Sequence, residues 1–178
     1  GTYNNGSDSL LLESDISNIV QIYSTNQAFA ALTNDGRVNI WGSNYGGTYT
    51  NGRDGLLPVD DISNIVQIYS TDYAFAALTN DGRVNIWGDG WSGGTYTNRD
   101  VSGLLPESDI SNIVQIYSTG YAFAALTNDG RVNIWGSSGY GATYNGTSGS
   151  DLLGLLPESD ISNIVQIYST GSAFAALT

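Results

Sequence analysis

Carboxylates and arginines are the charged side chains with which this chain could do chemistry. The sequence has 178 residues, with 17 Asp and Glu against five Lys and Arg, for a formal net charge of −12 at pH 7. All five cations are arginine, and there is no histidine, cysteine or methionine. Thiolate nucleophiles, disulfides, imidazole bases, Schiff-base lysines and zinc sites made of Cys or His are therefore excluded. The acidic charge also argues against nucleic acid as a partner.

Paired carboxylates are the remaining candidates for metal or acid–base chemistry. They occur as Asp60/Asp61, Glu107/Asp109 and Glu158/Asp160. Calcium takes oxygen ligands, but these loops lack the alternating Asp/Asn pattern of a calcium loop. A catalytic pair of the glycosidase kind has no reason to be copied into every repeat. We therefore predict no catalytic residue and no cofactor, with calcium as the alternative.

The positions of these residues follow an internal repeat. A segment beginning Asp-Ile-Ser-Asn-Ile-Val occurs at 15–42, 61–88 and 109–136, and in part at 160–178. The copies differ only in one dipeptide, at 26–27, 72–73, 120–121 and 171–172. Successive copies are offset by 46, 48 and 51 residues. Such a spacing indicates one array of stacked units. We predict units at 1–42, 43–88, 89–136 and 137–178, the last without its NDGRVNIWG strand.

Each unit carries the signals of a small antiparallel sheet. The β-branched and aromatic segment Ile19–Thr25 predicts a strand. Ala28–Thr33 is rich in helix formers, but the Asn-Asp-Gly turn signal and the alternating segment Arg37–Trp41 favour a hairpin. We expect three strands per unit, and four if Gly-Thr-Tyr-Thr at 47–50 pairs at the edge. The fold class predicted is all-β, with β-propeller-like blades; a β-solenoid is the alternative.

The segment AFAALTNDGRVNIWGSNYGG at 28–47 resembles the repeat of the regulator-of-chromosome-condensation family, in a bacterial-type variant. The match rests on the Asp-Gly-x-Val-x-x-Trp-Gly spacing, which recurs at 81–88 and 129–136. This resemblance implies a propeller of about seven four-stranded blades that serves mainly as an interaction module. Some members promote nucleotide exchange on small GTPases, and some bacterial relatives inhibit enzymes by docking. Nothing in this sequence matches the exchange loop, so exchange activity is not implied.

Two sets of side chains are candidate sites. The first set would form ion pairs between successive units, with solvated hairpin residues as the alternative; it comprises Arg37, Arg83, Arg131, Asp61, Asp109 and Asp160. The second set would contact a partner; it comprises Trp91, Tyr45, Tyr73, Tyr121, Tyr140 and Tyr144. Trp91 is the strongest of these because it stands alone in a connector. By contrast, we expect the repeated Trp41, Trp87 and Trp135 to pack between units.

The function predicted is a non-enzymatic repeat protein with a structural or adhesive role, extracellular or at the cell surface. Because the last unit lacks a strand, its open edge invites head-to-tail pairing with another copy, in a ring or a filament. The alternative is a propeller-type binding module that holds a protein partner or a glycan through its variable connectors. No apolar run is long enough to span a membrane, so we expect no membrane insertion.

Overall fold

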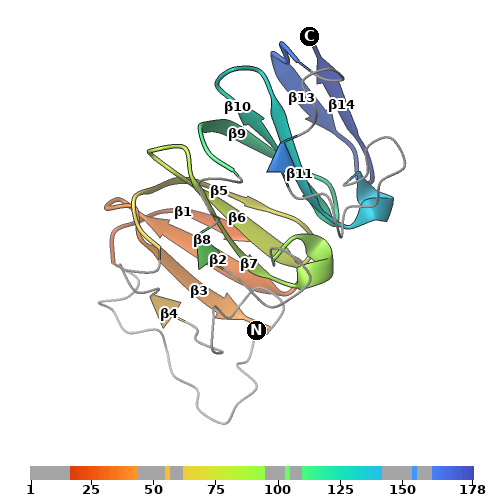
Figure 1. The fold of residues 1–178 in the computed structure, drawn as a ribbon. Helices are drawn as coiled ribbons and strands as arrows, with labels where there is room; N and C mark the ends of the chain where they lie inside the picture. The colour runs from red at the N-terminus through yellow and green to blue at the C-terminus, as the bar shows by residue number, and fades with distance from the viewer. Residues whose placement is uncertain are drawn as a thin grey trace.

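The computed structural model describes residues 17–43, 62–94, 110–141 and 162–178, with the backbone of three short strands at 55–56, 103–104 and 154–155. Every element in these ranges is a β-strand or a single 3-10 turn. The strands form three four-stranded antiparallel sheets and one two-stranded sheet. The sheets follow one another in sequence order, with β1–β3 and β13–β14 at opposite ends of the row (Figure 1). The all-β prediction is confirmed.

Within each sheet, every strand pairs with the next strand of the chain. The first sheet contains β1 (Ile19–Ser24), β2 (Ala28–Thr33), β3 (Val38–Gly42) and β4 (Gly55–Leu56). The second contains β5 (Ile65–Ser70), β6 (Ala74–Thr79), β7 (Val84–Gly88) and β8 (Gly103–Leu104). The third contains β9 (Ile113–Ser118), β10 (Ala122–Thr127), β11 (Val132–Gly136) and β12 (Gly154–Leu155). The last contains β13 (Gln166–Ser169) and β14 (Phe174–Leu177). The 3-10 turns η1 (Gly90–Ser92) and η2 (Ser138–Tyr140) follow β7 and β11.

The hairpin predicted at Asn-Asp-Gly joins the second and third strands of each complete copy. In the second sheet, the Gly82 N–H donates to the Thr79 carbonyl at 3.1 Å, and the Thr79 N–H donates to the Arg83 carbonyl at 2.9 Å. Gly82 has a φ of +78°, the left-handed conformation that glycine adopts most readily. The turn therefore overrides the helical preference of the alanine-rich strand before it.

The fourth strand comes from a segment for which no strand was predicted. Gly55 and Leu56 pair with Ile40 and Asn39 of β3. The segment 47–50, in which we expected this strand, lies outside the described residues. The hydrogen-bonded sheet therefore takes its last strand from the connector that follows the repeated segment.

The hydrophobic core lies between successive sheets. Leu32, Val38 and Ile40 on one face of the first sheet pack with residues on the facing side of the second, namely Ile65, Ile68, Phe75, Ala77 and Trp87. The equivalent residues of the second and third sheets repeat this arrangement. Trp87 and Trp135 are buried, at 0% and 1% exposure, as predicted for packing between units. The same prediction is wrong for Trp41, which is half-buried and stacks on Phe29 of its own sheet, because no described sheet precedes the first one. Because the second and third sheets bury each face against a neighbouring sheet, the stack is the unit of stability.

Backbone hydrogen bonds also join successive sheets at both ends of the strands. At the hairpin end, the N–H of Ile113 donates to the Gly82 carbonyl at 2.9 Å, and Ile65 bonds Gly36 in the same way. At the other end, the N–H of Asp72 donates to the Gly120 carbonyl at 2.8 Å. These bonds fix the turns of neighbouring sheets against one another, and the second set positions the surface described next.

Candidate binding surface

One end of the stack brings together the turns in which the repeated copies differ. We call this surface the turn face; it consists of the turns at 25–27, 71–73, 119–121 and 170–172 together with η1 and η2. Thr71 Oγ1 donates to the Ser92 carbonyl at 3.0 Å, and Thr119 Oγ1 donates to the Tyr140 carbonyl at 2.8 Å. These bonds attach each 3-10 turn to the turn that follows the first strand of its own sheet. The four variable dipeptides therefore lie on the same face as both 3-10 turns.

The turn face contains an open hollow of about 400 Å³. Its lining is polar, because the turns of all four sheets contribute hydroxyl groups and backbone. Asp72 is the acidic residue of the hollow. Backbone hydrogen bonds hold Asp72 to the turns on both sides: the Asp72 N–H donates to the Gly120 carbonyl, and the Asp72 carbonyl accepts from the Asn26 N–H at 3.0 Å. A carboxylate is thus held at a defined place at the edge of the hollow.

Three tyrosines from two adjacent sheets form a row beside Asp72. The ring of Tyr121 lies 5.8 Å from that of Tyr73 and 4.5 Å from that of Tyr140, between centroids, and both pairs are tilted by about 45°. Tyr73 and Tyr121 are half-buried, while Tyr140 is 37% exposed. Burial raises the pKa of Tyr121, and the neighbouring tyrosines and the Asp72 carboxylate raise it further. All three residues were candidate contacts in the sequence, but only the structure brings them together.

Trp91 protrudes from the same face. Its side chain is 81% exposed, the largest value among the exposed large hydrophobic residues described. The turn that carries it is held by Ser92 Oγ, which donates to the Asp89 carboxylate at 2.9 Å, and by the Gly94 N–H, which donates to the Asp89 carbonyl at 2.8 Å. An exposed indole on a fixed turn is available to a binding partner at a small cost in conformational entropy.

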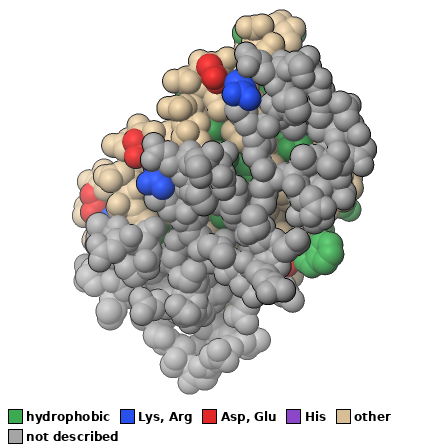
Figure 2. Space-filling model, viewed as in Figure 1, with side chains coloured by type: hydrophobic (Ala, Val, Ile, Leu, Met, Phe, Trp, Pro, Cys, Tyr) green, Lys and Arg blue, Asp and Glu red, His purple; other side chains and the backbone are tan. Residues whose placement is uncertain are grey.

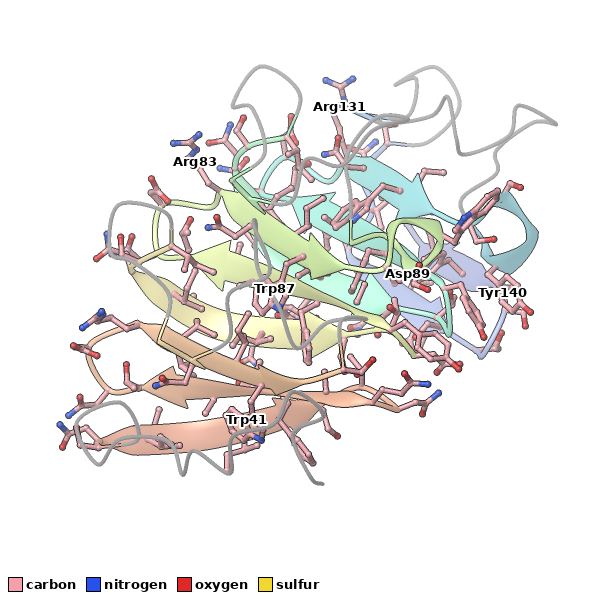
Figure 3. All side chains as sticks on the ribbon, turned by 90° about the horizontal axis from the view of Figure 1, so that it is seen from below. Trp41, Arg83, Trp87, Asp89, Arg131 and Tyr140 are labelled. Atoms are coloured by element: carbon pink, nitrogen blue, oxygen red, sulfur yellow. The ribbon has the colours of Figure 1, made fainter. Side chains whose placement is uncertain are left out.

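The arginine candidates lie at the opposite end of the sheets. Figure 3 shows Arg83 and Arg131 at one end and Asp89 and Tyr140 at the other. Acidic and basic side chains stand next to one another along one margin of the molecule (Figure 2). There, Thr79 Oγ1 donates to the Asp81 carboxylate and accepts from the Arg83 N–H at 2.9 Å. The hydroxyl bond lowers the pKa of Asp81, and the charge of Arg83 lowers it further.

The remaining candidates fall outside the described ranges. They are Tyr45, Tyr144, Asp61, Asp109 and Asp160, together with the three carboxylate pairs considered for calcium. The ion pairs between units and the calcium site therefore stay predictions. Within the described residues, no three acidic side chains come close enough to form a metal site. No helix of the described part is long and apolar enough to cross a membrane.

Three residues of the turn face were not predicted from the sequence. The sequence marks Asp72 only as half of a variable dipeptide, and the strand pattern places Thr71 and Thr119 at strand ends. The hydroxyls of Thr71 and Thr119 each accept the backbone N–H of the residue three positions later, Ala74 and Ala122, at 3.0 Å. A Ser/Thr residue followed by a variable dipeptide is the signal of such a turn, and it was present in every copy.

A family model described as "Regulator of chromosome condensation (RCC1) repeat" matches residues 113–142, from the start of β9 to just beyond η2. The chain is built from RCC1-like repeats. No curated protein matches it. The first two copies repeat residues 113–136 of the matched segment except at the variable dipeptide, and the fourth copy repeats it as far as Thr178, again except at that dipeptide.

Solved structures, two of them of yeast Prp20, share the fold. Human WBSCR16 aligns with a TM-score of 0.62 and 21% identity, over 89% of this chain and 45% of its own. Yeast RCC1 (Prp20) bound to Kap60 aligns at 0.61 and 20% identity, over 85% of this chain and 38% of its own. Prp20p from Saccharomyces cerevisiae, in a study of its binding to Gsp1p and histones, aligns with a TM-score of 0.59 and 22% identity, over 90% of this chain and 41% of its own. The four sheets are therefore propeller blades, and the chain spans less than half the length of each of these proteins.

Proposed function

We propose that this chain is a non-catalytic RCC1-like binding module that holds a protein partner on its turn face. The observation that supports this most is where the copies differ. All four variable dipeptides and both 3-10 turns lie on the turn face, whereas the hairpin end repeats Asn-Asp-Gly-Arg in every complete copy. In repeat proteins, insertions and variable residues on one face often make the binding surface. Exposed aromatic residues such as Trp91 and Tyr140 are typical anchors of protein interfaces.

The aligned yeast structures are the reason for proposing a protein as the partner. One of the aligned structures holds yeast RCC1 (Prp20) bound to Kap60, and another concerns the binding of Prp20p to Gsp1p and histones. A protein is therefore the first ligand to test on the turn face. A glycan stacked on the aromatic residues is the alternative.

Site-specific photo-crosslinking in the native cells tests the proposal. A photoreactive amino acid is placed at Trp91 or Tyr140 on the turn face, and at the exposed hairpin positions Asn80 or Asn128 as matched controls. We expect one protein to be crosslinked from the turn face and not from the hairpins. The purified partner should then lose affinity for Trp91→Ala but not for Asn80→Ala. Crosslinking from the hairpins alone, or none from the turn face, overturns the proposal. A glycan crosslinked from the turn face would show that the ligand is a glycan and not a protein.

A second candidate function is the head-to-tail self-assembly expected from the sequence. Ile22 and Phe29 on the open face of the first sheet are 55% and 44% exposed, whereas the equivalent Phe75 is fully buried against a neighbouring sheet. On the open face of β13–β14, Tyr168 and Leu177 are 58% and 50% exposed. Ile22 and Phe29 correspond to one side of the interface between successive sheets, and Tyr168 and Leu177 correspond to the other side. The two open faces of neighbouring copies would therefore match. An extracellular or cell-surface location stays a prediction from composition.

Two single variants test this second function in solution. Phe29→Asp blocks one open face and Leu177→Asp blocks the other. If the association is head to tail, the parent chain forms oligomers, each variant alone is monomeric, and an equimolar mixture of the two gives a dimer, since one intact pair of faces remains. Sedimentation of the parent chain as a monomer at every concentration would exclude self-assembly.

A further inference from the structure

We propose that Asp72, Tyr73, Tyr121 and Tyr140, which we call the Asp–Tyr cluster, bind the cationic side chain of an arginine or lysine in the partner. This inference rests on the protein-binding function proposed for the turn face and names the chemistry that the face recognises. It concerns one side chain of the partner, held between a carboxylate and aromatic rings.

The arrangement of the rings supports a cationic ligand. Tyr121 lies between its two neighbours, with centroid distances of 5.8 Å to Tyr73 and 4.5 Å to Tyr140, and its planes are tilted by 43° and 46° to theirs. A cation within about 6 Å of the centroid of an aromatic ring is attracted by the negative face of that ring. Tyr140 is exposed and the other two are half-buried, so a side chain can reach the row from solvent.

The charge at this place is negative and not compensated by the described residues. A Cβ at Gly120 would lie 3.5 Å from Oδ2 of Asp72, which places the carboxylate beside the residue before Tyr121. In the part of the chain that the structure describes, no hydrogen bond to the Asp72 carboxylate is made. The described arginines lie at the hairpin end, as Figure 3 shows for Arg83 and Arg131. A guanidinium or ammonium group from a partner would bond the carboxylate directly.

The repeats themselves supply a comparison. The second residue of the variable dipeptide is Tyr73 in the second copy and Tyr121 in the third, but Gln27 in the first and Ser172 in the fourth. Since the surrounding sequence is identical, the fold does not require tyrosine at this position. The two tyrosines are in adjacent copies, where they touch each other, and the connector that follows the third copy adds Tyr140 to the same row. The cluster is therefore a local departure from a repeated framework.

Titration of the 178-residue chain with defined peptides tests the inference. The probe is an acetylated, amidated arginine–glycine pentapeptide, and the reference is the same peptide with glutamine for arginine. Ring resonances of labelled tyrosine follow the titration at physiological salt, which weakens the general attraction of a cation to an acidic chain. We expect saturable shifts of the Tyr73, Tyr121 and Tyr140 rings with the arginine peptide only.

Variants taken from the chain's own repeats separate the cluster from general electrostatics. Tyr121→Ser introduces the residue that the fourth copy has at this position, so the fold should be retained, and Asp72→Asn removes the charge. Each is expected to raise the Kd of the arginine peptide about tenfold. Gln27→Ala, at the equivalent position of the first copy, should leave the Kd unchanged. Melting temperatures measured for all variants verify folding.

Three outcomes overturn the inference. Equal binding of the glutamine peptide would show that charge is not recognised. Equal weakening of binding by Gln27→Ala would show that the cluster is not the site. A loss of affinity in Asp72→Asn without a loss in Tyr121→Ser would show that the peptide is held by charge attraction alone. The proposed function has its own test. If crosslinking from Trp91 identifies a partner while the arginine peptide fails to bind, the turn face binds protein and only the cationic ligand is wrong.

Discussion

The indole N–H of Trp135 donates to the backbone carbonyl of Gly93, at 3.2 Å and 42 positions earlier in the sequence. Gly93 ends the 3-10 turn that carries Trp91, and Trp135 belongs to the core of the next blade. The bond therefore joins the turn that carries the candidate contact residue of one blade to the core of its neighbour. It satisfies a buried indole N–H that would otherwise lose its hydrogen bond to water.

Replacing Gly93 by alanine should destabilise the stack. Gly93 has a φ of +89°, and a Cβ there would lie 2.7 Å from Cδ2 of Phe123, a fully buried ring that stacks on Trp135. Strain in the backbone and overpacking of the core add, so we expect Gly93→Ala to lower the free energy of unfolding by about 2–4 kcal/mol. Urea unfolding measures this.

A glycine inside the other 3-10 turn is the control. A Cβ at Gly139 in η2 would meet no atom within 4 Å, and the φ of this residue is not positive. Gly139→Ala should therefore change stability by less than about 0.5 kcal/mol. Equal losses for the two variants would mean that the close approach to Phe123 does not limit residue 93.

Two phenylalanines in the same local sequence should respond very differently to truncation. Phe123 is fully buried and packs against Trp135, whereas Phe29, which stacks on Trp41 in the first blade, is 44% exposed. We expect Phe123→Ala to lower the free energy of unfolding by about 3–5 kcal/mol. Phe29→Ala should cost about 1 kcal/mol, since its ring is only partly removed from water. Equal costs in urea unfolding would show that position in the stack does not set the contribution.

This pair shows what the sequence alone can predict about the fold. The strands, the hairpin and the packing of Trp87 and Trp135 between units followed from residue types and spacing. The exposure of Phe29 did not, because its local sequence is that of Phe123. Burial here depends on which blade lies opposite, and no local pattern contains that information.

The register of the strands could not be predicted from the sequence either. In β5, alternation predicts that Ile65 and Ile68 lie on opposite faces, yet both are buried at 4% and 1% exposure. The register shifts between Ile65 and Gln67, so Val66 is an extra residue at a bulge and is 52% exposed. A bulge changes which side chains share a face, and nothing in a β-branched run marks its position. The three tyrosines were candidate contacts in the sequence, but their contact with one another was not predicted, since Tyr73 and Tyr121 belong to different blades and meet only when the blades stack.

The turn hydroxyls should matter most where they are buried. Thr71 Oγ1 accepts from the Ala74 N–H at 3.0 Å and donates to the Ser92 carbonyl at 3.0 Å, and the residue is 5% exposed. Thr71→Val keeps the shape but leaves these buried groups without partners, so we expect a loss of about 1–3 kcal/mol. The equivalent Thr170 is exposed, and Thr170→Val should cost less than about 1 kcal/mol in the same urea unfolding experiment.

The Thr71 variant has a second consequence, on the turn that carries Trp91. Without the hydroxyl bond to Ser92, this turn is released from the turn at 71–73, and the Trp91 indole should gain mobility. The order of the Trp91 side chain, followed by NMR relaxation, should fall in Thr71→Val and not in Thr170→Val. Unchanged relaxation in Thr71→Val would mean that the Asp89–Ser92 bonds hold the turn without help.

Acid should weaken the hairpins through their aspartates. The hydroxyl of Thr79, and secondarily the charge of Arg83, hold the pKa of Asp81 below its usual value, and Thr33 does the same for Asp35. A carboxyl whose pKa is lower in the folded chain stabilises the fold at a pH above its unfolded pKa of about 4, and this contribution is lost as the pH falls through the folded value. Stability from these hairpins should therefore decline below about pH 5.

Asp81→Asn isolates the effect of one carboxylate from the changing net charge of the chain. Its amide oxygen still accepts from Thr79 but does not titrate, so the variant should be less stable than the parent at neutral pH. The gap in melting temperature should narrow as the parent's Asp81 becomes protonated in acid. Asn80→Ser, an exposed neighbour that does not titrate, should keep a constant offset from the parent. If the gap for Asp81→Asn also stays constant down to about pH 2, the hydroxyl bond does not depend on the charge of the carboxylate.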